Sequence, residues 1–510
     1  MPVKKIDYLK VGKATDLSGS DKKLYRALEM VPGIFSWGTL VILVVFSFIK
    51  PIWVAYFIIA FDVYWLLLVV YLGIHLFASY KKMKANLKVD WKEACRKLPG
   101  WEEIYHLVIL PTYMESAEVI RPTIQAIKDE GYPAEKMIVV LAVEEREGEA
   151  GVLKAGIIQE EFSKYFGDFL ITYHPDTPGE LKGKGANQAF AAKKVKEAII
   201  DPKKINYDKI LVSVFDVDTI IHPGYFYCLA KTFLTVPDPY RASYQPIPLY
   251  HNNVWRAPFF ARVAASSNTF WQMMQQVRQE KLATYSSHSM TWRALVEMGF
   301  WSTTMVSEDS RIFWHGFCYY NGDYRVEPLY FPLSMDVTMD ITPWQTMKSL
   351  YRQQRRWGWG VENVPYLFFN FIKNYKKAPK GKYLSRIFVQ LYGFHSWATN
   401  ALIIGVIGWL PVFFGGKSFN AMVISSNLPF VTRSLMTVAM IGLVFSAVVS
   451  TMLLPSRPKN YGIGKSLTMF LQWIILPVSI IVFGSIPGLE AQTRLALGKY
   501  MGFFVTPKER

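Results

Sequence analysis

The stretch Lys209-Ile-Leu-Val-Ser-Val-Phe-Asp216-Val-Asp218, near the middle of the chain, decides the fold. It is an apolar run typical of a buried strand, and it ends in two carboxylates two positions apart. Side chains at i and i+2 of a strand point to the same face. We therefore expect Asp216 and Asp218 together at the carboxyl end of a strand, where open α/β sheets bind their ligands. Two carboxylates there can hold a hard divalent cation on a ligand's phosphates. The alternative is a turn after a strand, because Asp favours turns.

Other strand-like runs precede this stretch, at residues 104–110, 137–143 and 169–173, and the stretch itself contributes residues 210–215. Helical patterns lie between the runs, at residues 116–130, 149–166 and 186–200. Strands that alternate with helices predict a mostly parallel sheet with helices on both faces. Right-handed crossovers then place the strand ends on one edge of the sheet.

Polar clusters follow three of these four runs. They are Thr112, Tyr113 and Glu115 after the first run, Glu144 and Glu145 after the second, and Asp216 and Asp218 after the fourth. Because the carboxyl ends of these strands share one edge, the clusters predict a binding site rather than three unrelated turns.

The composition indicates a protein that is partly embedded in a membrane. Hydrophobic residues make up 51% of the 510 residues and charged residues only 19%. The formal net charge of +17 fits anionic lipid or nucleotide phosphate, and no RNA- or DNA-binding pattern is present, so we expect no nucleic-acid partner. Three cysteines without metal-binding spacing fit a reducing compartment and no disulfide framework.

Apolar stretches flank a central soluble region. The polar, Lys-rich residues 1–30 are expected in the cytoplasm, and residues 31–80 form a helical hairpin whose spanning candidates, 34–49 and 52–80, are separated by Lys50-Pro51. Lysines beside the hairpin place both of its ends in the cytoplasm. Residues 81–380 contain no spanning segment and are expected to form a cytoplasmic domain.

The chain then returns to the membrane over residues 381–490. This region holds an amphipathic segment at 384–391 and spanning candidates at 397–414, 435–454 and 467–486, before a basic tail at 491–510. Two spans before the domain and three after it would leave the tail outside. A sixth crossing near residues 413–432, or a re-entrant segment marked by Pro477 and Pro487, would bring it back, and we expect a cytoplasmic tail.

Three further segments carry chemistry. Lys184 and Asn187 lie in a basic, glycine-containing stretch that opens a helix, where exposed N–H groups and positive charge favour a phosphate. Glu308 and Asp309 stand at another helix start, as a general base or simply as acids favoured by the helix dipole. Gln353, Arg356 and Trp357 share one helix face and can contact a diphosphate and a sugar ring. The alternatives are a flexible helix start for the first segment and an ordinary basic interfacial helix for the third.

In this order, the segments resemble the membrane-embedded family 2 glycosyltransferases, which include cellulose and hyaluronan synthases. The family's D-x-D, T/S-E-D and Q-x-x-R-W motifs stand here as Asp216-Val-Asp218, Ser307-Glu308-Asp309 and Gln353-Gln-Arg-Arg356-Trp357. The likeness covers roughly residues 30–510. It implies a Rossmann-like GT-A domain between membrane helices, in a multi-pass protein of the cell membrane.

The resemblance also implies the reaction, an inverting and metal-dependent transfer of a hexose to a growing polysaccharide. The donor would be a nucleotide-diphosphate sugar, for which we expect a UDP-sugar. The alternatives are single transfer to a lipid-linked acceptor, and a catalytically silent membrane scaffold that binds nucleotide sugars. Membrane lipids are expected partners in each case.

The resemblance gives roles to individual residues. Asp218 with Asp216 would hold Mg²⁺ or Mn²⁺ on the donor diphosphate, and Asp309, beside Glu308, would be the base for the acceptor hydroxyl. The expected binding residues are Thr112, Tyr113 and Glu115 in the nucleotide turn, Glu144 or Glu145 in place of an early Asp, Lys184 and Asn187 beside the nucleotide, Gln245 in a Q-T-P-like segment, His288 in the acceptor loop, and Gln353, Arg356 and Trp357 along the diphosphate and acceptor.

The last matching segment is Phe503-Phe-Val505-Thr506-Pro-Lys508, which resembles the gating-loop motif F-x-V-T-x-K of cellulose synthases. It implies that Thr506 and Lys508 contact the nucleotide. The alternative is a basic tail on anionic lipid.

Overall fold

The computed structural model describes residues 7–504 and contains one eight-stranded sheet in the order β3-β2-β1-β4-β7-β6-β8-β5. Its strands are β1 (Tyr105–Thr112), β2 (Met137–Glu144), β3 (Asp168–His174), β4 (Ile210–Val214), β5 (Ile220–Ile221), β6 (Ala242–Tyr250), β7 (Ser289–Thr291) and β8 (Arg325–Met335).

The four predicted strands are confirmed as β1 to β4, and all pair in parallel. His106 pairs with Met137 between β1 and β2, and Tyr105 pairs with Ile210 between β1 and β4. The second half of the sheet was not predicted. There β7 runs antiparallel to both β4 and β6, so that the sheet is mixed.

Helices cover both faces of the sheet. Leu107 and Ile109 of β1 face one buried cluster, and Val108 and Leu110 face the other, as the two-residue period of a strand requires. The first cluster is formed with α6 (Lys184–Val195), α9 (Trp292–Glu297) and α10 (Glu308–Tyr319). The second is formed with α4 (Ala117–Asp129), α5 (Glu149–Phe162) and α7 (Tyr225–Thr235).

Three helices lie between the sheet and the apolar part of the molecule: α8 (Phe259–Gln276), α11 (Pro343–Gly358) and α12 (Asn363–Lys373). The short helix α3 (Trp91–Arg96) packs beside α7. The helix α11 begins with a capping box in which Thr342 accepts from the Gln345 N–H, and Pro343 takes the first helical position.

The apolar part is made of α1 (Gly19–Ile49), α2 (Pro51–Asn86), α13 (Lys380–Gly405), α14 (Leu410–Phe414), α15 (Gly416–Asn420), α16 (Val423–Leu453), α17 (Ile463–Leu471), α18 (Leu476–Ile480) and α19 (Ile486–Ala496). Among the described residues, four helices are long and apolar enough to cross a membrane: Gly19–Ile49, Pro51–Asn86, Val423–Leu453 and Ile463–Ala496. A fifth candidate is the bent pair Lys380–Gly405 and Ile407–Phe414, with an angle of 41°.

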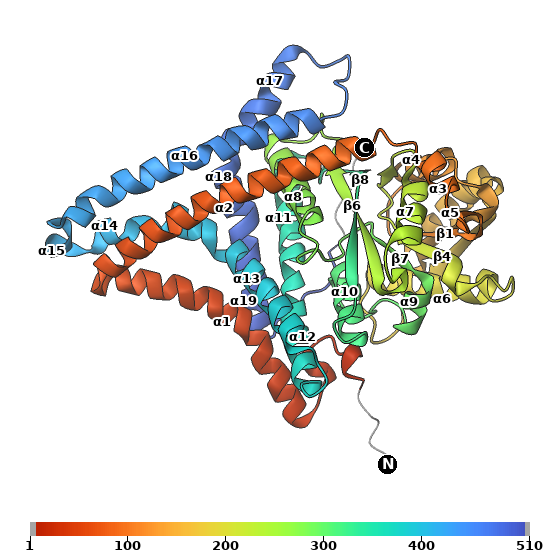
Figure 1. The fold of residues 1–510 in the computed structure, drawn as a ribbon, viewed down its shortest axis with the longest axis horizontal. Coiled ribbons are helices and arrows are strands. Elements are labelled where there is room, and N and C mark those ends of the chain that lie inside the picture. Colours follow the sequence, from red (N-terminus) through yellow and green to blue (C-terminus); the bar gives the residue numbers. More distant parts are fainter. Residues whose placement is uncertain (1–6, 505–510) are drawn as a thin grey trace.

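These helices do not all run in the same direction. In Figure 1, α1, α2, α13 with α14, and α16 extend away from the sheet, and α2 lies along α16. The segment from α17 to α19, which includes the expected span at residues 467–486, runs across them and packs on α11 and α1. It is broken by short 3-10 and π turns, and Pro477 and Pro487 each stand at the start of a new helix.

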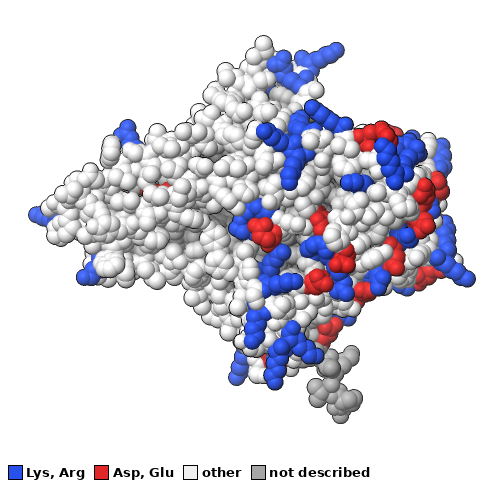
Figure 2. Space-filling view, in the orientation of Figure 1, with Lys and Arg blue, Asp and Glu red and all other residues white. Residues whose placement is uncertain are grey.

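The distribution of charged side chains also separates the extended helices from the sheet. Figure 2 shows a nearly uncharged surface over the extended helices and a charged surface over the sheet, with Lys and Arg gathered at the border. Large apolar side chains are exposed on the extended helices, such as Leu67 (64%) and Ile441 (68%). Such a surface is suited to lipid rather than water.

Candidate active site

The centre of the site lies where β4 ends. Asp216 and Asp218 follow this strand, and Lys184, the first residue of α6, places its Nζ 2.8 Å from Asp216 Oδ1. The same nitrogen lies 3.1 Å from Oδ1 of Asp309, at the start of α10. Since each carboxylate oxygen lies about 3 Å from one nitrogen, the two oxygens are less than about 6 Å apart. The fold thus brings three separately predicted segments together.

The charges at this centre depend on one another. Burial by itself would lower the pKa of Lys184, but the Asp216 and Asp309 carboxylates raise it above its usual value, so Lys184 stays charged. Burial, and then the neighbouring charge of Asp309, raise the pKa of Glu308 to about 8. At neutral pH Glu308 is therefore mainly protonated, which leaves Asp309 as the better candidate for a base.

The loop before β7 adds hydroxyl groups to the centre. Ser286 Oγ donates to Asp216 Oδ2 at 2.6 Å, and Thr284 Oγ1 donates to the backbone carbonyl of Asp309 at 2.5 Å. This loop therefore orients the Asp216 carboxylate directly and holds the backbone of Asp309, in addition to the contact of both carboxylates with Lys184.

Gln245 and His288 support the same loop. The buried Gln245 accepts the Tyr285 N–H at 2.8 Å, and His288 Nδ1 lies 2.9 Å from the Tyr285 carbonyl oxygen. Burial lowers the pKa of His288, and its Nε2 has no hydrogen-bond partner within residues 7–504. The direct contacts of Gln245 and His288 with a substrate stay predictions.

A buried network fixes the start of α10. Glu362 accepts the Ser307 N–H at 3.0 Å and the Ser307 hydroxyl at 2.5 Å. Asn363 Nδ2 donates to Ser310 Oγ at 3.0 Å. Because Ser307 and Ser310 enclose Glu308 and Asp309, this network sets the direction in which Asp309 leaves the helix.

Arg311 extends the network to the beginning of the chain. Its Nε donates to Asn363 Oδ1 at 2.7 Å, its guanidinium lies 3.9 Å from the Tyr366 ring, and a third contact joins it to the backbone carbonyl of Val11 at 3.3 Å. Residues 7–18, expected only as a polar segment, thus pack beside α10.

The turn after β1, which is expected to bind the nucleotide, is held by its own carboxylate. Glu115 Oε2 accepts from Thr112 Oγ1 at 2.9 Å and from the Tyr113 N–H at 2.7 Å. Lys154 donates to Thr112 Oγ1 at 3.1 Å. The guanidinium of Arg146 lies 3.7 Å from the Tyr113 ring, which forms a flat, partly charged surface beside the turn.

The neighbouring ends of β2 and β3 carry a buried acid–imidazole cluster. His174 lies between Glu144 (3.3 Å) and Glu180 (3.0 Å). Burial lowers the pKa of His174, but the two carboxylates more than offset this, so that its pKa is raised. Glu145 is exposed, and Asn187 donates to the backbone of β2 at 2.8 Å.

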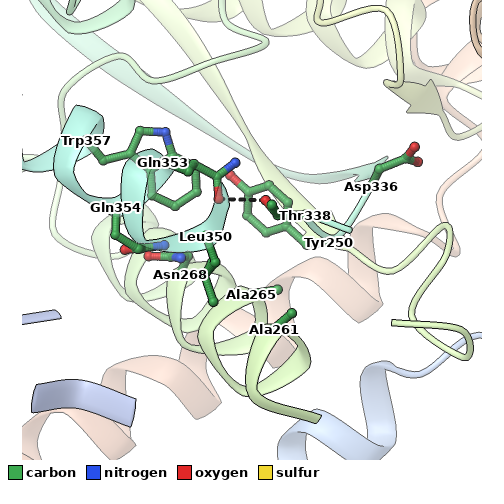
Figure 3. Close-up of a pocket in the computed structure, with 10 residues that line it drawn as sticks. All are labelled: Tyr250, Ala261, Ala265, Asn268, Asp336, Thr338, Leu350, Gln353, Gln354 and Trp357. Atoms are coloured by element: carbon green, nitrogen blue, oxygen red, sulfur yellow. Dashed lines mark hydrogen bonds between the residues drawn. The ribbon is translucent and has the colours of Figure 1, made fainter. Parts of the chain in front are cut away.

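The helix α11 presents its predicted residues on two sides. Figure 3 shows Gln353 and Trp357 at a small cavity, where Gln353 accepts a hydrogen bond from Thr338 Oγ1 at 2.7 Å. The ring of Trp357 lies beside that of Tyr250, with centroids 6.2 Å apart. A flat aromatic face next to amide groups is suited to a sugar ring.

Arg356 points to the end of the described chain instead. Its guanidinium lies 4.8 Å from the centre of the Phe503 ring. A Cβ on Gly183 would lie only 2.7 Å from a ring carbon of Phe503, so no other residue fits there without displacing the ring. Phe503 therefore covers the start of α6 next to Lys184. Thr506 and Lys508 lie outside the described residues.

Asp336 is a carboxylate that the sequence interpretation missed. It follows β8, its N–H donates to Asp218 Oδ2 at 3.1 Å, and Asn252 Nδ2 bridges Asp336 Oδ1 and the Asp218 carbonyl at 2.9 Å each. The signal was present, because Asp336 ends an apolar strand just as Asp216 does. Glu362 and Arg311 gave no such signal, since only the folded chain places them beside α10.

Comparison with known proteins identifies the family. The model of the glycosyl transferase family group 2 matches residues 211–484, more than half of the chain. The chain belongs to this family. The glycosyltransferase also resembles solved structures, although no curated protein sequence matches it.

Two of the similar structures are described in complex with a nucleotide sugar. A mannosyltransferase from Pyrobaculum calidifontis, solved with GDP-Man and Mn²⁺, is 16% identical, with a TM-score of 0.42 over 74% of this chain and 98% of its own. S. aureus TarS, residues 1–349, solved with UDP-GlcNAc, is 10% identical, with a TM-score of 0.31 over 68% of this chain and 91% of its own.

The carboxylate oxygens of Asp216 and Asp218 are suited to a divalent cation that the glycosyltransferase shares with a substrate. Within residues 7–504, no group of three or more His, Cys, Asp or Glu is arranged to hold a metal ion alone. Asp216 and Asp218 supply hard carboxylate oxygens, and the Lys184 ammonium already occupies a cation's place on Asp216. Mg²⁺ is typically bound by one or two carboxylates plus substrate phosphates, which is the set that these residues can complete.

Proposed function

We propose that this enzyme is a membrane-embedded, inverting glycosyltransferase that transfers a sugar from a nucleotide-diphosphate sugar to a glycan. One observation carries the proposal. Lys184 joins the first carboxylate of the D-x-D segment to Asp309 of the S-E-D segment. Gln353 and Trp357 of α11 line a cavity together with Asp336, whose N–H binds Asp218 Oδ2. Three motifs that are distant in the sequence thus supply one centre of the kind that sugar transfer needs.

In the proposed reaction, Asp309 accepts the proton of the acceptor hydroxyl. The oxygen then forms a bond to the anomeric carbon from the face opposite the diphosphate. The bond to the diphosphate oxygen breaks at the same time, and the nucleoside diphosphate leaves with the electron pair. Glu308, protonated at neutral pH, adds no second negative charge beside Asp309.

Asp216 and Asp218 would hold Mg²⁺ or Mn²⁺, which offsets charge on the leaving diphosphate when it is bound. Lys184 and Arg356 supply positive charge on the same side. The turn with Thr112, Tyr113 and Glu115 and the ends of β2 and β3, with Glu144, Glu145 and Asn187, are the proposed surface for the nucleoside.

The proposed arrangement in the membrane has four crossings, formed by α1, α2, α13 with α14, and α16. The segment from α17 to α19 would lie along the cytoplasmic surface, as its direction across the other helices supports (Figure 1). The catalytic domain, residues 81–380, and the tail from 491 then lie on one side, in the cytoplasm. The border of Lys and Arg in Figure 2 would contact anionic lipid.

The position of Phe503 supports a covering role for the end of the chain. Phe503 packs on Gly183 beside Lys184 and on Arg356, next to the proposed diphosphate site. We include in the proposal that Thr506 and Lys508 contact the bound nucleotide.

The test is transfer from a panel of radiolabelled UDP- and GDP-sugars by the purified full chain in lipid nanodiscs, with Mg²⁺, Mn²⁺ or a chelator. We expect one donor to be used only with a divalent cation, and Asp309→Asn to lose at least about 100-fold in kcat. If no donor is bound or used, or if Asp309→Asn keeps full activity, the proposal is wrong.

The length of the product separates two forms of the reaction. A polymerase gives long, labelled glycans from a short pulse of donor. If the products carry only one added sugar on a lipid-linked acceptor, the enzyme catalyses single transfer and does not make a polysaccharide.

A further inference from the structure

The beginning of the described chain forms a strap, residues 8–17, that lies against the catalytic domain. In Figure 1 the strap, at the red end of the chain, lies directly beside α10. Its apolar side chains Val11, Ala14 and Leu17 are all buried. Only a polar segment was expected here, and no motif lies in it, so the burial of these side chains calls for an explanation.

The strap contacts the loop at residues 302–306, which leads into α10 and its two acidic residues. A Cβ on Gly12 would lie only 2.6 Å from Met305 Sδ, so a larger residue at this position would displace Met305. The backbone carbonyl of Val11 accepts a hydrogen bond from Arg311 of α10 at 3.3 Å. The strap therefore holds both the loop before α10 and the first turn of α10 itself.

The end of the described chain contacts the same loop at the neighbouring residue. Residues 500–503, which we call the cover, pack Tyr500 and Phe503 against a buried cluster that contains Val306. Since Met305 meets the strap and Val306 meets the cover, the loop before α10 is held by both ends of the described chain. A movement of either end would therefore reach the proposed base through this loop.

One buried carboxylate joins the strap to the cover. Glu29 of α1 is only 1% exposed, and its Oε1 accepts from the Ala14 N–H and from the Tyr500 hydroxyl, at 3.0 Å each. Arg26 donates to Glu29 Oε2 at 2.6 Å and to the Leu495 carbonyl at 2.8 Å, so the buried charge is compensated. Because a buried carboxylate that loses a donor is costly, Glu29 keeps the strap and the cover together.

We propose that Glu29 is a positioning residue for the proposed base, Asp309. Through Glu29 the strap and the cover hold the loop before α10 together, so that Asp309 takes its working position when the cover lies over the donor site. This role rests on the proposed function. It adds that residues 8–17, remote in sequence from every motif, set the rate of transfer, and that the two ends of the chain act as one unit.

The first test measures hydrogen exchange of the full chain in lipid nanodiscs, without substrate. Tyr500→Phe keeps the ring and removes only the hydroxyl that Glu29 accepts. We expect the backbone amides of residues 8–17 and 302–310 to exchange about tenfold faster in this variant, as the loss of one hydrogen bond implies. Tyr375→Phe, at a tyrosine that is 50% exposed, is the matched control and should leave both segments unchanged.

The second test adds Gly12→Val, which moves the strap away from the loop. With the sugar donor that the wild type uses, we expect kcat to fall about tenfold in Gly12→Val and in Tyr500→Phe. In Gly12→Val the cover keeps its bond to Glu29, so the KM for the donor should not change. Because both variants act through one series of contacts, the double variant should lose no more than Gly12→Val alone. Thr15→Ala, at an exposed position of the strap, is the control.

Three results would overturn the positioning role. They are equal exchange of residues 302–310 in Tyr500→Phe and Tyr375→Phe, an unchanged kcat in Gly12→Val, and a double variant whose loss equals the product of the two single losses. If Gly12→Val does not fold, or if the wild type transfers no sugar and the proposed function fails separately, the exchange measured in Tyr500→Phe decides whether the two ends of the chain hold the loop together.

Discussion

Lys184 stands between two carboxylates that the proposed reaction uses for different purposes. Asp216 belongs to the metal and diphosphate, and Asp309 to the acceptor hydroxyl. The lysine side chain is 11% exposed, so its charge is little screened by water. Two carboxylates this close, without a cation between them, would repel each other strongly.

We therefore predict that Lys184→Met lowers the free energy of unfolding by about 3 kcal/mol, the typical cost of breaking a buried ion pair. Mn²⁺ should restore part of this loss, because a metal ion can replace the ammonium, and should raise the melting temperature of Lys184→Met more than that of the wild type. Lys184→Arg, which keeps the charge, is the control. If Mn²⁺ raises the melting temperatures of Lys184→Met and of the wild type equally, Lys184 does not occupy the place of the metal ion.

Glu308 gives a prediction that depends on pH. Its pKa in the folded protein, about 8, is above the ordinary value of 4.5, so between these values the folded state binds more protons than the unfolded state. Stability therefore falls as pH rises through this window, by up to about 1.4 kcal/mol per pH unit. The Gln side chain of Glu308→Gln cannot ionise, so the stability of this variant should not fall in the same way as pH rises. Unfolding curves at intervals from pH 5 to 8 measure it, and parallel pH profiles of the two proteins would refute it.

At the scale of elements, the position of α10 depends on side chains outside α10. Glu362 orders the residue before the helix through two hydrogen bonds, and small displacements of a catalytic group are costly. We predict that Glu362→Ala lowers kcat about 10- to 100-fold and leaves the KM for the donor unchanged.

Glu362→Gln keeps an oxygen that accepts from Ser307, so it should recover most of the rate. This rescue separates positioning from a loss of folding, as would a melting temperature that stays well above the assay temperature. A fall in donor affinity equal to the fall in kcat would contradict the assignment.

The elements also show what the sequence could and could not predict. Buried parallel strands are continuous apolar runs, so β1 to β4 and the carboxylates that follow β4 were predictable. The strand β5 has two residues and β7 three, too short for any period. The contact between Glu362 and Ser307 could not be predicted, because only the packing of α12 beside α10 creates it.

At the scale of the whole molecule, the proposed four crossings place the loop at α15 and the end of the chain on opposite sides of the membrane. Labelling can test this with little background, since Cys95, Cys228 and Cys318 are all buried. We predict that Lys417→Cys reacts with an impermeant maleimide in intact cells. Lys499→Cys should react only after the membrane is opened. Labelling of both in intact cells would mean that Ile463–Ala496 is a fifth span.

The helix α11, which bears the proposed acceptor residues, is fastened to the segment from α17 to α19 that runs across the proposed membrane helices. Gly358 lies so close to Gly488 that a Cβ on it would be 3.2 Å from the Gly488 Cα, and Glu490 accepts from Arg355 and Tyr351 at 2.7 Å each. In the proposed orientation, this fixes the height of the reacting centre above the bilayer. The enzyme would then modify only those hydroxyl groups that stand at one set distance from the lipid surface.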